Sequence, residues 1–158
     1  MHMTKANVLV VEDEFIISKD IQSSLKKLGY NVIGAAPSGE KALELLAQEQ
    51  PDIVLMDIML KGEMNGIETA EIVRNEYAIP VIYLTAYADE ATLAKAKVTE
   101  PYGYILKPFK EIDLHTSIEM ALYKHKKEQE VERERDMLYS LVENKEKEIG
   151  RASCRERV

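Results

Sequence analysis

An apolar run that ends on a single acid constrains the fold of this chain most. Residues 53–56 read Ile-Val-Leu-Met, and Asp57 follows directly. A short continuous apolar run of this kind is typical of a strand that is buried on both faces of a parallel sheet. In open α/β sheets, ligands bind just beyond the carboxyl ends of such strands. We therefore predict that Asp57 lies at a functional edge of the sheet and is the reactive group.

The segments around this run alternate between strand and helix patterns. Buried strands are predicted at 6–11, 31–36, 53–57, 81–84 and 104–106. The segments that follow them carry apolar residues at helical spacing, and the last helix begins at Glu111. Five strands alternating with five helices predict a three-layer α/β domain with a parallel sheet. Right-handed crossovers favour a flavodoxin-like, doubly wound sheet in the order 2-1-3-4-5.

Polar or ionisable side chains stand where four of the five predicted strands end. They are Glu12 and Asp13, Asp57, Thr85, and Lys107. Taken singly, such residues often only cap a helix or lie in solvent. Because the carboxyl ends of parallel strands share one edge of the sheet, we expect these four groups to converge.

Three carboxylates at one edge require positive charge. Two unit charges about 4 Å apart interact by about 4 kcal/mol at an effective dielectric constant of about 20, and Lys107 supplies one cation. With oxygen ligands and no His or Cys nearby, Mg²⁺ is the predicted cation and Mn²⁺ its substitute. Once the charge is neutralised, the carboxylate of Asp57 can attack phosphorus and form an aspartyl phosphate. The hydroxyl of Thr85 can donate to a phosphoryl oxygen.

Five motifs give the chain a resemblance to a known family. They read V-L-V-V-E-D-E at 8–14, D-I-V-L-M-D at 52–57, N-G-I-E at 65–68, Y-L-T-A at 83–86 and Y-I-L-K-P-F at 104–109. In this order and spacing, over residues 6–123, they resemble the CheY-like receiver domain of two-component response regulators. The resemblance implies that Asp57 is the phosphoacceptor. It also implies that Asp13 binds Mg²⁺ directly, Glu12 through water, and Met59 through its backbone carbonyl.

The resemblance further implies a conformational switch. Thr85 is expected to move toward the phosphoryl group, Lys107 to pair with it, and Tyr104 to turn inward, which changes the surface of the fourth helix, fifth strand and fifth helix. The Lys107–Pro108 peptide bond is expected to be cis. The bulky Met59 and Tyr87 are expected to hinder the attacking water and slow self-dephosphorylation.

A member of this family is a cytoplasmic signalling switch and no enzyme beyond its own Mg²⁺-dependent phosphotransfer and dephosphorylation. The implied partners are a sensor histidine kinase or phosphotransfer protein and an unknown output domain or protein. A homodimer through the switch surface or the C-terminal helix is a further expectation. The alternative is the receiver module of a larger hybrid sensor protein, truncated after its linker.

Two other classes fit the residues less well. A haloacid-dehalogenase-like phosphatase needs a second acid two residues after its nucleophile, where Met59 stands. A flavin-binding flavodoxin-like module needs a phosphate-binding loop after the first strand, where residues 12–14 read Glu-Asp-Glu. A receiver that is never phosphorylated is disfavoured by the complete set of site residues.

Composition disfavours nucleic acid and membranes as direct partners. Residues 1–123 carry 11 Lys/Arg and 19 Asp/Glu, a net charge of −8, which disfavours direct contact with nucleic acid. The sequence contains no apolar stretch near the roughly 18 residues that span a membrane, so no membrane contact is expected. The single Cys154 excludes an internal disulfide.

The C-terminal part has a different character. Residues 124–147 are highly charged and predict an exposed helical linker, with a sparse apolar seam made by Val131, Leu138, Leu141 and Val142. A solvated linker and a coiled coil both remain open, since Glu134 and Lys145 interrupt the seam. Residues 148–158 match the in-frame translation of a common sequencing adapter. We expect them to be non-native and the natural chain to continue beyond Lys147.

Overall fold

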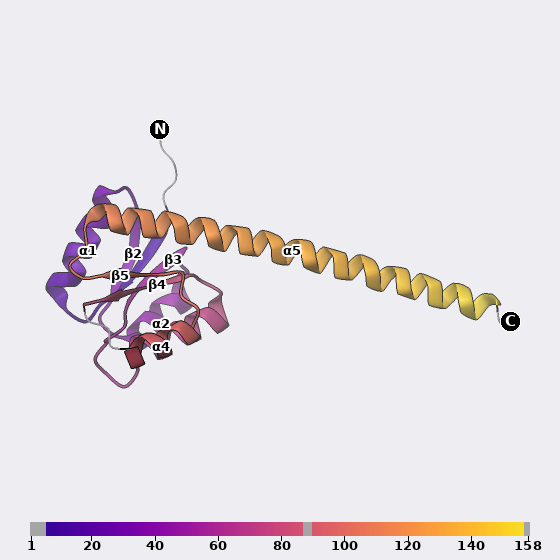
Figure 1. Cartoon of the computed structure of the whole chain (residues 1–158), viewed down its shortest axis with the longest axis horizontal. Helices are drawn as coiled ribbons and strands as arrows, with labels where there is room; N and C mark the ends of the chain where they lie inside the picture. The colour runs from indigo at the N-terminus through magenta and orange to yellow at the C-terminus, as the bar shows by residue number, and fades with distance from the viewer. Residues whose placement is uncertain (1–5, 87–89, 157–158) are drawn as a thin grey trace. The chain divides into compact units, whose positions relative to one another are not determined.

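The computed structural model describes residues 6–86 and 90–156, with side chains up to residue 145. The chain divides into two compact units, Met1–Leu122 and Tyr123–Val158. The first unit holds the sheet and every candidate site residue. Figure 1 labels the helices and strands.

The sheet has the predicted topology. Its strands are β1 (Asn7–Val11), β2 (Asn31–Ala36), β3 (Ile53–Asp57), β4 (Val81–Thr85) and β5 (Gly103–Leu106). They lie in the order β2-β1-β3-β4-β5, and every neighbouring pair is parallel. This confirms the flavodoxin-like α/β fold. The three central strands are almost entirely apolar, which suits strands covered on both faces.

The helices are α1 (Phe15–Lys27), α2 (Gly39–Gln48), α3 (Gly66–Ile72), α4 (Glu90–Val98) and α5 (Glu111–Glu156). Local caps fix two of their starts. The Ser38 side chain accepts from the Lys41 N–H at α2, and Asn65 and Glu68 form a capping box at α3.

The apolar spacing over residues 67–76 predicts a helix, and the structure forms an α-helix there only as far as Ile72. After Ile72 the chain forms a π-helical turn, η1 (Val73–Tyr77), and Ala78 follows in the left-handed conformation with φ 53°. The apolar spacing that predicted a helix does not separate an α-helical from a π-helical turn. The sequence also predicts a short, alanine-rich helix over residues 89–98, and its first residue, Asp89, lies outside the described residues.

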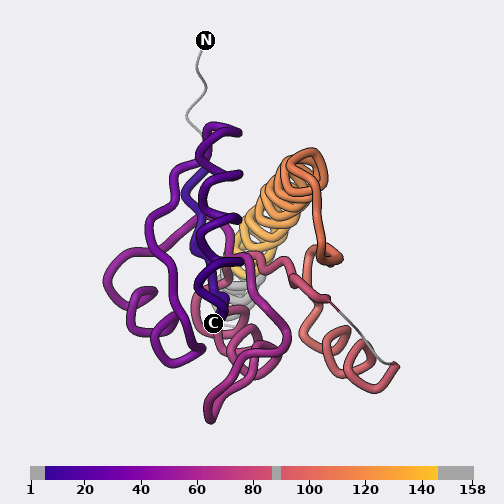
Figure 2. The backbone as a smooth tube through the Cα atoms, turned by 90° about the vertical axis from the view of Figure 1, so that its left-hand side faces the viewer, coloured from indigo at the N-terminus to yellow at the C-terminus, as the bar shows by residue number. Residues whose placement is uncertain are grey.

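Two hydrophobic cores pack against opposite faces of the sheet, as the helices on its two sides in Figure 2 suggest. One core contains Ile21 and Leu25 of α1 and Leu114 of α5. The other contains Ala42 of α2 and Ala96 of α4. Side chains along a strand alternate between faces. The strands β1 to β4 therefore contribute to both cores, whereas β5 contributes Ile105 to one of them.

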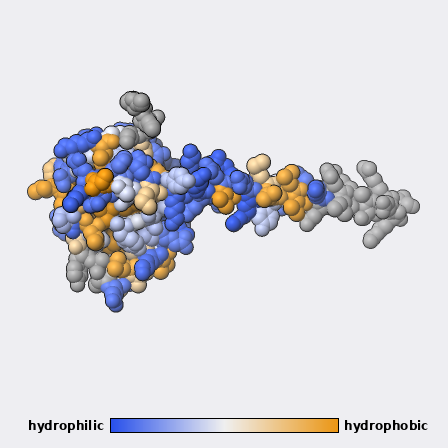
Figure 3. Space-filling model, turned by 45° about the horizontal axis from the view of Figure 1, so that its top comes forward, coloured by the Kyte–Doolittle hydropathy of each residue, from blue (hydrophilic) through white to orange (hydrophobic). Residues whose placement is uncertain are grey.

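The second unit consists of the α5 residues from Tyr123 onward. Its apolar side chains are exposed among charged ones, as the orange residues between blue ones in Figure 3 show. The large ones among the described side chains are Tyr123, Val131, Met137, Leu138, Tyr139, Leu141 and Val142. Among the described residues, no helix is long and apolar enough to span a membrane.

Candidate functional site

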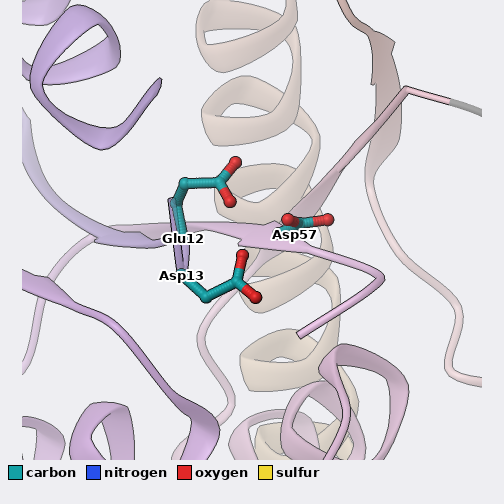
Figure 4. Close-up of side chains that lie close together, drawn as sticks. All are labelled: Glu12, Asp13 and Asp57. Carbon is teal, nitrogen blue, oxygen red and sulfur yellow. The ribbon is translucent and has the colours of Figure 1, made fainter. Parts of the chain in front are cut away.

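Three carboxylates converge at the carboxyl edge of the sheet. Glu12 and Asp13 directly follow β1, and Asp57 is the last residue of β3. One carboxylate oxygen from each lies within 4.8 Å of the other two, and Figure 4 shows the three groups facing a common space. Glu12 and Asp57 are buried, whereas Asp13 is half-buried. The three acids therefore converge at the strand ends, as the sequence predicts.

Lys107, just after β5, reaches into the same cluster. Its Nζ atom donates a short hydrogen bond to Oε1 of Glu12 and lies 3.3 Å from Oδ2 of Asp57. The Lys107 side chain is 12% exposed, so water screens these ion pairs poorly. The amine is therefore placed between two of the three acids, where it neutralises part of their charge.

Lys107 compensates only part of the cost of burying the negative charge of Glu12. The pKa of Glu12 is raised to about 7, first by burial and then by its hydrogen bond to Asp57, although Lys107 opposes the shift. Burial alone would lower the pKa of Lys107, but its hydrogen bond to Glu12 and the charges of Asp57 and Glu12 raise it overall. The cluster therefore holds a proton or another cation more readily than isolated carboxyl groups do.

The β3–α3 loop is tied to the acids by its backbone. The Met59 N–H donates to Oδ1 of Asp57 at 3.0 Å, and the Lys61 N–H donates to Oδ2 of Asp13 at 3.2 Å. At the end of this loop, a Cβ added to Gly66 would lie 2.0 Å from the backbone oxygen of Asp57. The loop thus packs closely enough to fix the position of Asp57.

The residue pattern and this geometry agree with a comparison to known families. The model of the response regulator receiver domain matches residues 8–119. The chain belongs to this family. The receiver domain is the part of response regulators of two-component systems that this family describes.

Curated relatives extend beyond the receiver domain. Residues of this chain are 33% identical over 115 positions to the transcriptional regulatory protein PdtaR of Mycobacterium tuberculosis, covering 73% of this chain and 56% of that protein. A probable transcriptional regulator, ycf27, of Guillardia theta is 36% identical over 119 positions, covering 75% and 46%. The chain spans about half the length of these curated relatives.

Solved structures show the same fold. The signal receiver domain of a modulated diguanylate cyclase from Desulfovibrio desulfuricans G20 is 39% identical, with a TM-score of 0.77, covering 79% of this chain and 99% of that one. The N-terminal domain of a response regulator/sensory box/GGDEF 3-domain protein from Carboxydothermus hydrogenoformans is 36% identical, with a TM-score of 0.72, covering 77% and 98%.

The donor set of the receiver domain fits a hard divalent cation. Three carboxylates supply oxygen ligands only, and Mg²⁺ and Mn²⁺ prefer such ligands. The amine of Lys107 lies against two of the acids, so one positive charge already stands at the edge of the cluster. The acidic cluster can thus hold Mg²⁺ on the chemistry of its side chains.

The predicted switch residues lie on the neighbouring strands β4 and β5 of the receiver domain. Thr85 ends β4 and is buried, and its carbonyl oxygen accepts from the Lys107 N–H at 2.8 Å. Tyr104 of β5 is 37% exposed. The Lys107–Pro108 peptide bond is cis. The side chain of Met59 is exposed, and Tyr87 lies outside the described residues.

Sequence reasoning missed two features of this site. Gly66 appeared only within the N-G-I-E motif, because nothing local shows that Asp57 approaches its Cα. Tyr83 was overlooked although it stands two residues before Thr85 and therefore shares its face of the sheet. Its ring centroid lies 5.9 Å from that of Tyr104. The sequence signal that could have identified Tyr83 is an aromatic residue two positions before the threonine at the strand end.

Proposed function

We propose that this receiver domain accepts a phosphoryl group on Asp57 from a phosphohistidine of a sensor histidine kinase or phosphotransfer protein. A carboxylate oxygen of Asp57 forms the new bond to phosphorus. The nitrogen–phosphorus bond breaks, and its electron pair returns to the histidine of the partner. The observation that carries the proposal is the position of Asp57, which lies within 4.8 Å of two further acids and 3.3 Å from Lys107 Nζ.

Glu12, Asp13 and Asp57 would hold Mg²⁺, together with the backbone carbonyl of Met59. When bound, the ion neutralises negative charge on the acids and on the transferred group. Lys107 supplies a fixed positive charge beside Asp57. Because phosphoryl transfer depends on positioning and charge neutralisation, these residues need not donate or remove a proton. Mn²⁺ is expected to substitute for Mg²⁺.

Phosphorylation then changes the surface made by α4, β5 and α5. The Thr85 hydroxyl turns toward the phosphoryl oxygens, Lys107 pairs with them, and Tyr104 turns inward. Support comes from strand register, which places Thr85 and Tyr104 on one face of adjacent strands. The result is a population shift between two states of that surface.

The altered surface would act on an output domain or protein in the cytoplasm, or pair two receivers. Exposed apolar residues support such a contact: Val98, Leu106, Ile112 and Met120. The helix beyond Tyr123 offers a second contact for a homodimer. We propose a receiver at 1–123, a linker at 124–147 and a non-native tail at 148–158. Similarity to an N-terminal domain of a three-domain protein also favours the alternative of a module of a larger sensor protein.

Mass spectrometry after incubation with acetyl phosphate and Mg²⁺ tests the phosphoacceptor. The expected result is a gain of one phosphoryl group in the wild-type protein and none in Asp57→Ala. Asp52→Ala is a matched control, because Asp52 lies at the opposite end of β3. An unmodified wild-type protein, or an Asp57→Ala variant that still gains the group, contradicts the proposal.

The lifetime of the phosphoryl group gives a separate prediction. The exposed Met59 is two residues beyond Asp57 and donates its N–H to that carboxylate, so its side chain stands near the path of attacking water. Self-dephosphorylation is expected to be slow and to accelerate several-fold in Met59→Asn, which retains the backbone N–H. A chase experiment measures the decay. Rapid decay that Met59→Asn leaves unchanged contradicts the prediction.

A further inference from the structure

Tyr83 is a buried aromatic residue next to the proposed switch. It is fully buried in the core between the sheet and the helices α2–α4. In the pairing of β4 with β5 it lies directly opposite Tyr104, and their ring planes are inclined by 34° with the centroids 5.9 Å apart. The ring of Tyr83 therefore forms the inner wall against which Tyr104 packs.

The hydroxyl of Tyr83 binds the C-terminal end of α4. It lies 2.7 Å from Oγ1 of Thr99, and both side chains are buried. The Thr99 hydroxyl donates its one proton to the carbonyl oxygen of Ala96, at 2.6 Å. Tyr83 must therefore be the donor in the first bond. Burial raises the pKa of Tyr83 to about 12, so the donor keeps its proton at neutral pH.

An ion pair makes a second polar contact at the end of α4. Arg74 of η1 forms an ion pair with Glu100, with Nη2 and Oε2 2.6 Å apart, but both side chains are largely exposed. Exposed ion pairs contribute little to stability. A buried chain of two hydrogen bonds is stronger, because water does not compete for its donors and acceptors. Tyr83 is thus the principal polar link from the sheet to this helix end among the described residues.

We propose that Tyr83 is a positioning residue that couples the side chain of Tyr104 to the C-terminal end of α4 through its hydrogen bond to Thr99. A rotation of Tyr104 must displace or repack the Tyr83 ring, and a shifted ring strains or breaks the bond to Thr99. The inference deepens the proposed switch and rests on it for the role of Tyr104. The coupling itself exists in the unphosphorylated protein.

Hydrogen exchange in a double-mutant cycle tests this coupling without phosphorylation or metal. The reporters are the amides of Thr99 and Glu100, which donate to the carbonyl oxygens of Ala96 and Lys97. Tyr83→Phe keeps the ring and removes the hydroxyl. The expected result is about fivefold faster exchange at both amides, which corresponds to the loss of one net hydrogen bond.

The second arm of the cycle removes the Tyr104 ring. Tyr104→Ala is expected to accelerate exchange at both amides about twofold or more in the wild-type background and to have no further effect in the Tyr83→Phe background. Thr99→Val should reproduce the effect of Tyr83→Phe at Glu100, and Thr99→Ser should restore slow exchange. Additive effects, or unchanged exchange in Tyr83→Phe, overturn the inference.

Tyr30→Phe is the matched control. Tyr30 is also buried, in the opposite core, and its hydroxyl contacts Nδ1 of His115 and donates to Glu119. Loss of the Tyr30 hydroxyl should destabilise the domain without selectively accelerating exchange at the amides of Thr99 and Glu100. Acceleration there equal to that in Tyr83→Phe overturns the inference. Because the mass experiment on Asp57 is separate, failure of the phosphoacceptor and failure of this coupling are distinguishable.

Discussion

Replacing Lys107 by methionine is expected to slow the phosphorylation of Asp57 by acetyl phosphate and Mg²⁺ by about 100-fold. Methionine keeps most of the length of the side chain and removes its charge. The amine lies 3.3 Å from Oδ2 of Asp57, where the transferred phosphoryl group would arrive. Loss of one preorganised charge at a reacting centre typically costs about 10²–10³ in rate. The time course of the mass increase measures the rate.

The same substitution should make the stability of the metal-free protein depend more steeply on pH. The pKa of Glu12 is already raised from 4.5 to about 7, so its protonated form favours folding. Stability from this group is present below pH 4.5 and is lost as pH rises through 7. Without Lys107, which lowers this pKa, ionisation of Glu12 costs more. Because pH 8 lies about one unit above the pKa of Glu12 in the wild type, we expect Lys107→Met to lose about 1 kcal/mol more stability at pH 8 than at pH 5.

Urea unfolding at pH 5, 6, 7 and 8 measures this difference. Lys110→Met is the matched control, because Lys110 is exposed and close in sequence. It should leave both the phosphorylation rate and the pH profile unchanged. Equal losses of stability at pH 5 and pH 8 in Lys107→Met would show that the amine does not act on the ionisation of Glu12.

The fold could be predicted because each strand is read from local sequence. The run at 53–57 is apolar without alternation, which a strand covered on both faces requires, and the connections leave one natural strand order. The convergence of Glu12, Asp13 and Asp57 then follows from topology alone. The described structure confirms the fold, and the acids lie as close together as the strand ends require.

What could not be predicted depends on contacts between distant segments. The sequence does not predict which acids Lys107 contacts, because a lysine side chain is long enough to reach either Glu12 or Asp57. In the structure it contacts both. The bond between Tyr83 and Thr99 joins a strand to the end of a helix 16 residues later. The π-helical turn at η1 has the same apolar spacing as an α-helix, so only backbone geometry separates them.

Gly66→Ala is the second large effect we expect, with a loss of about 3 kcal/mol or more in the free energy of unfolding. The added Cβ would lie 2.0 Å from the backbone oxygen of Asp57 and 2.9 Å from the Cα of Ile58. These are backbone atoms, which cannot rotate away, so the strand end or the start of α3 must shift. Overpacking of a rigid contact typically costs about 1–3 kcal/mol, and this contact is unusually close.

The clash also moves the functional residue itself. Because the obstructing oxygen belongs to Asp57, relief of the clash should misplace its carboxylate and lower phosphorylation even in protein that remains folded. Gly103→Ala is the matched control, since a Cβ there has no neighbour within 4 Å. Urea unfolding and the mass experiment compare the two variants. If Gly66→Ala is as stable and as readily phosphorylated as Gly103→Ala, the close approach of α3 does not position Asp57.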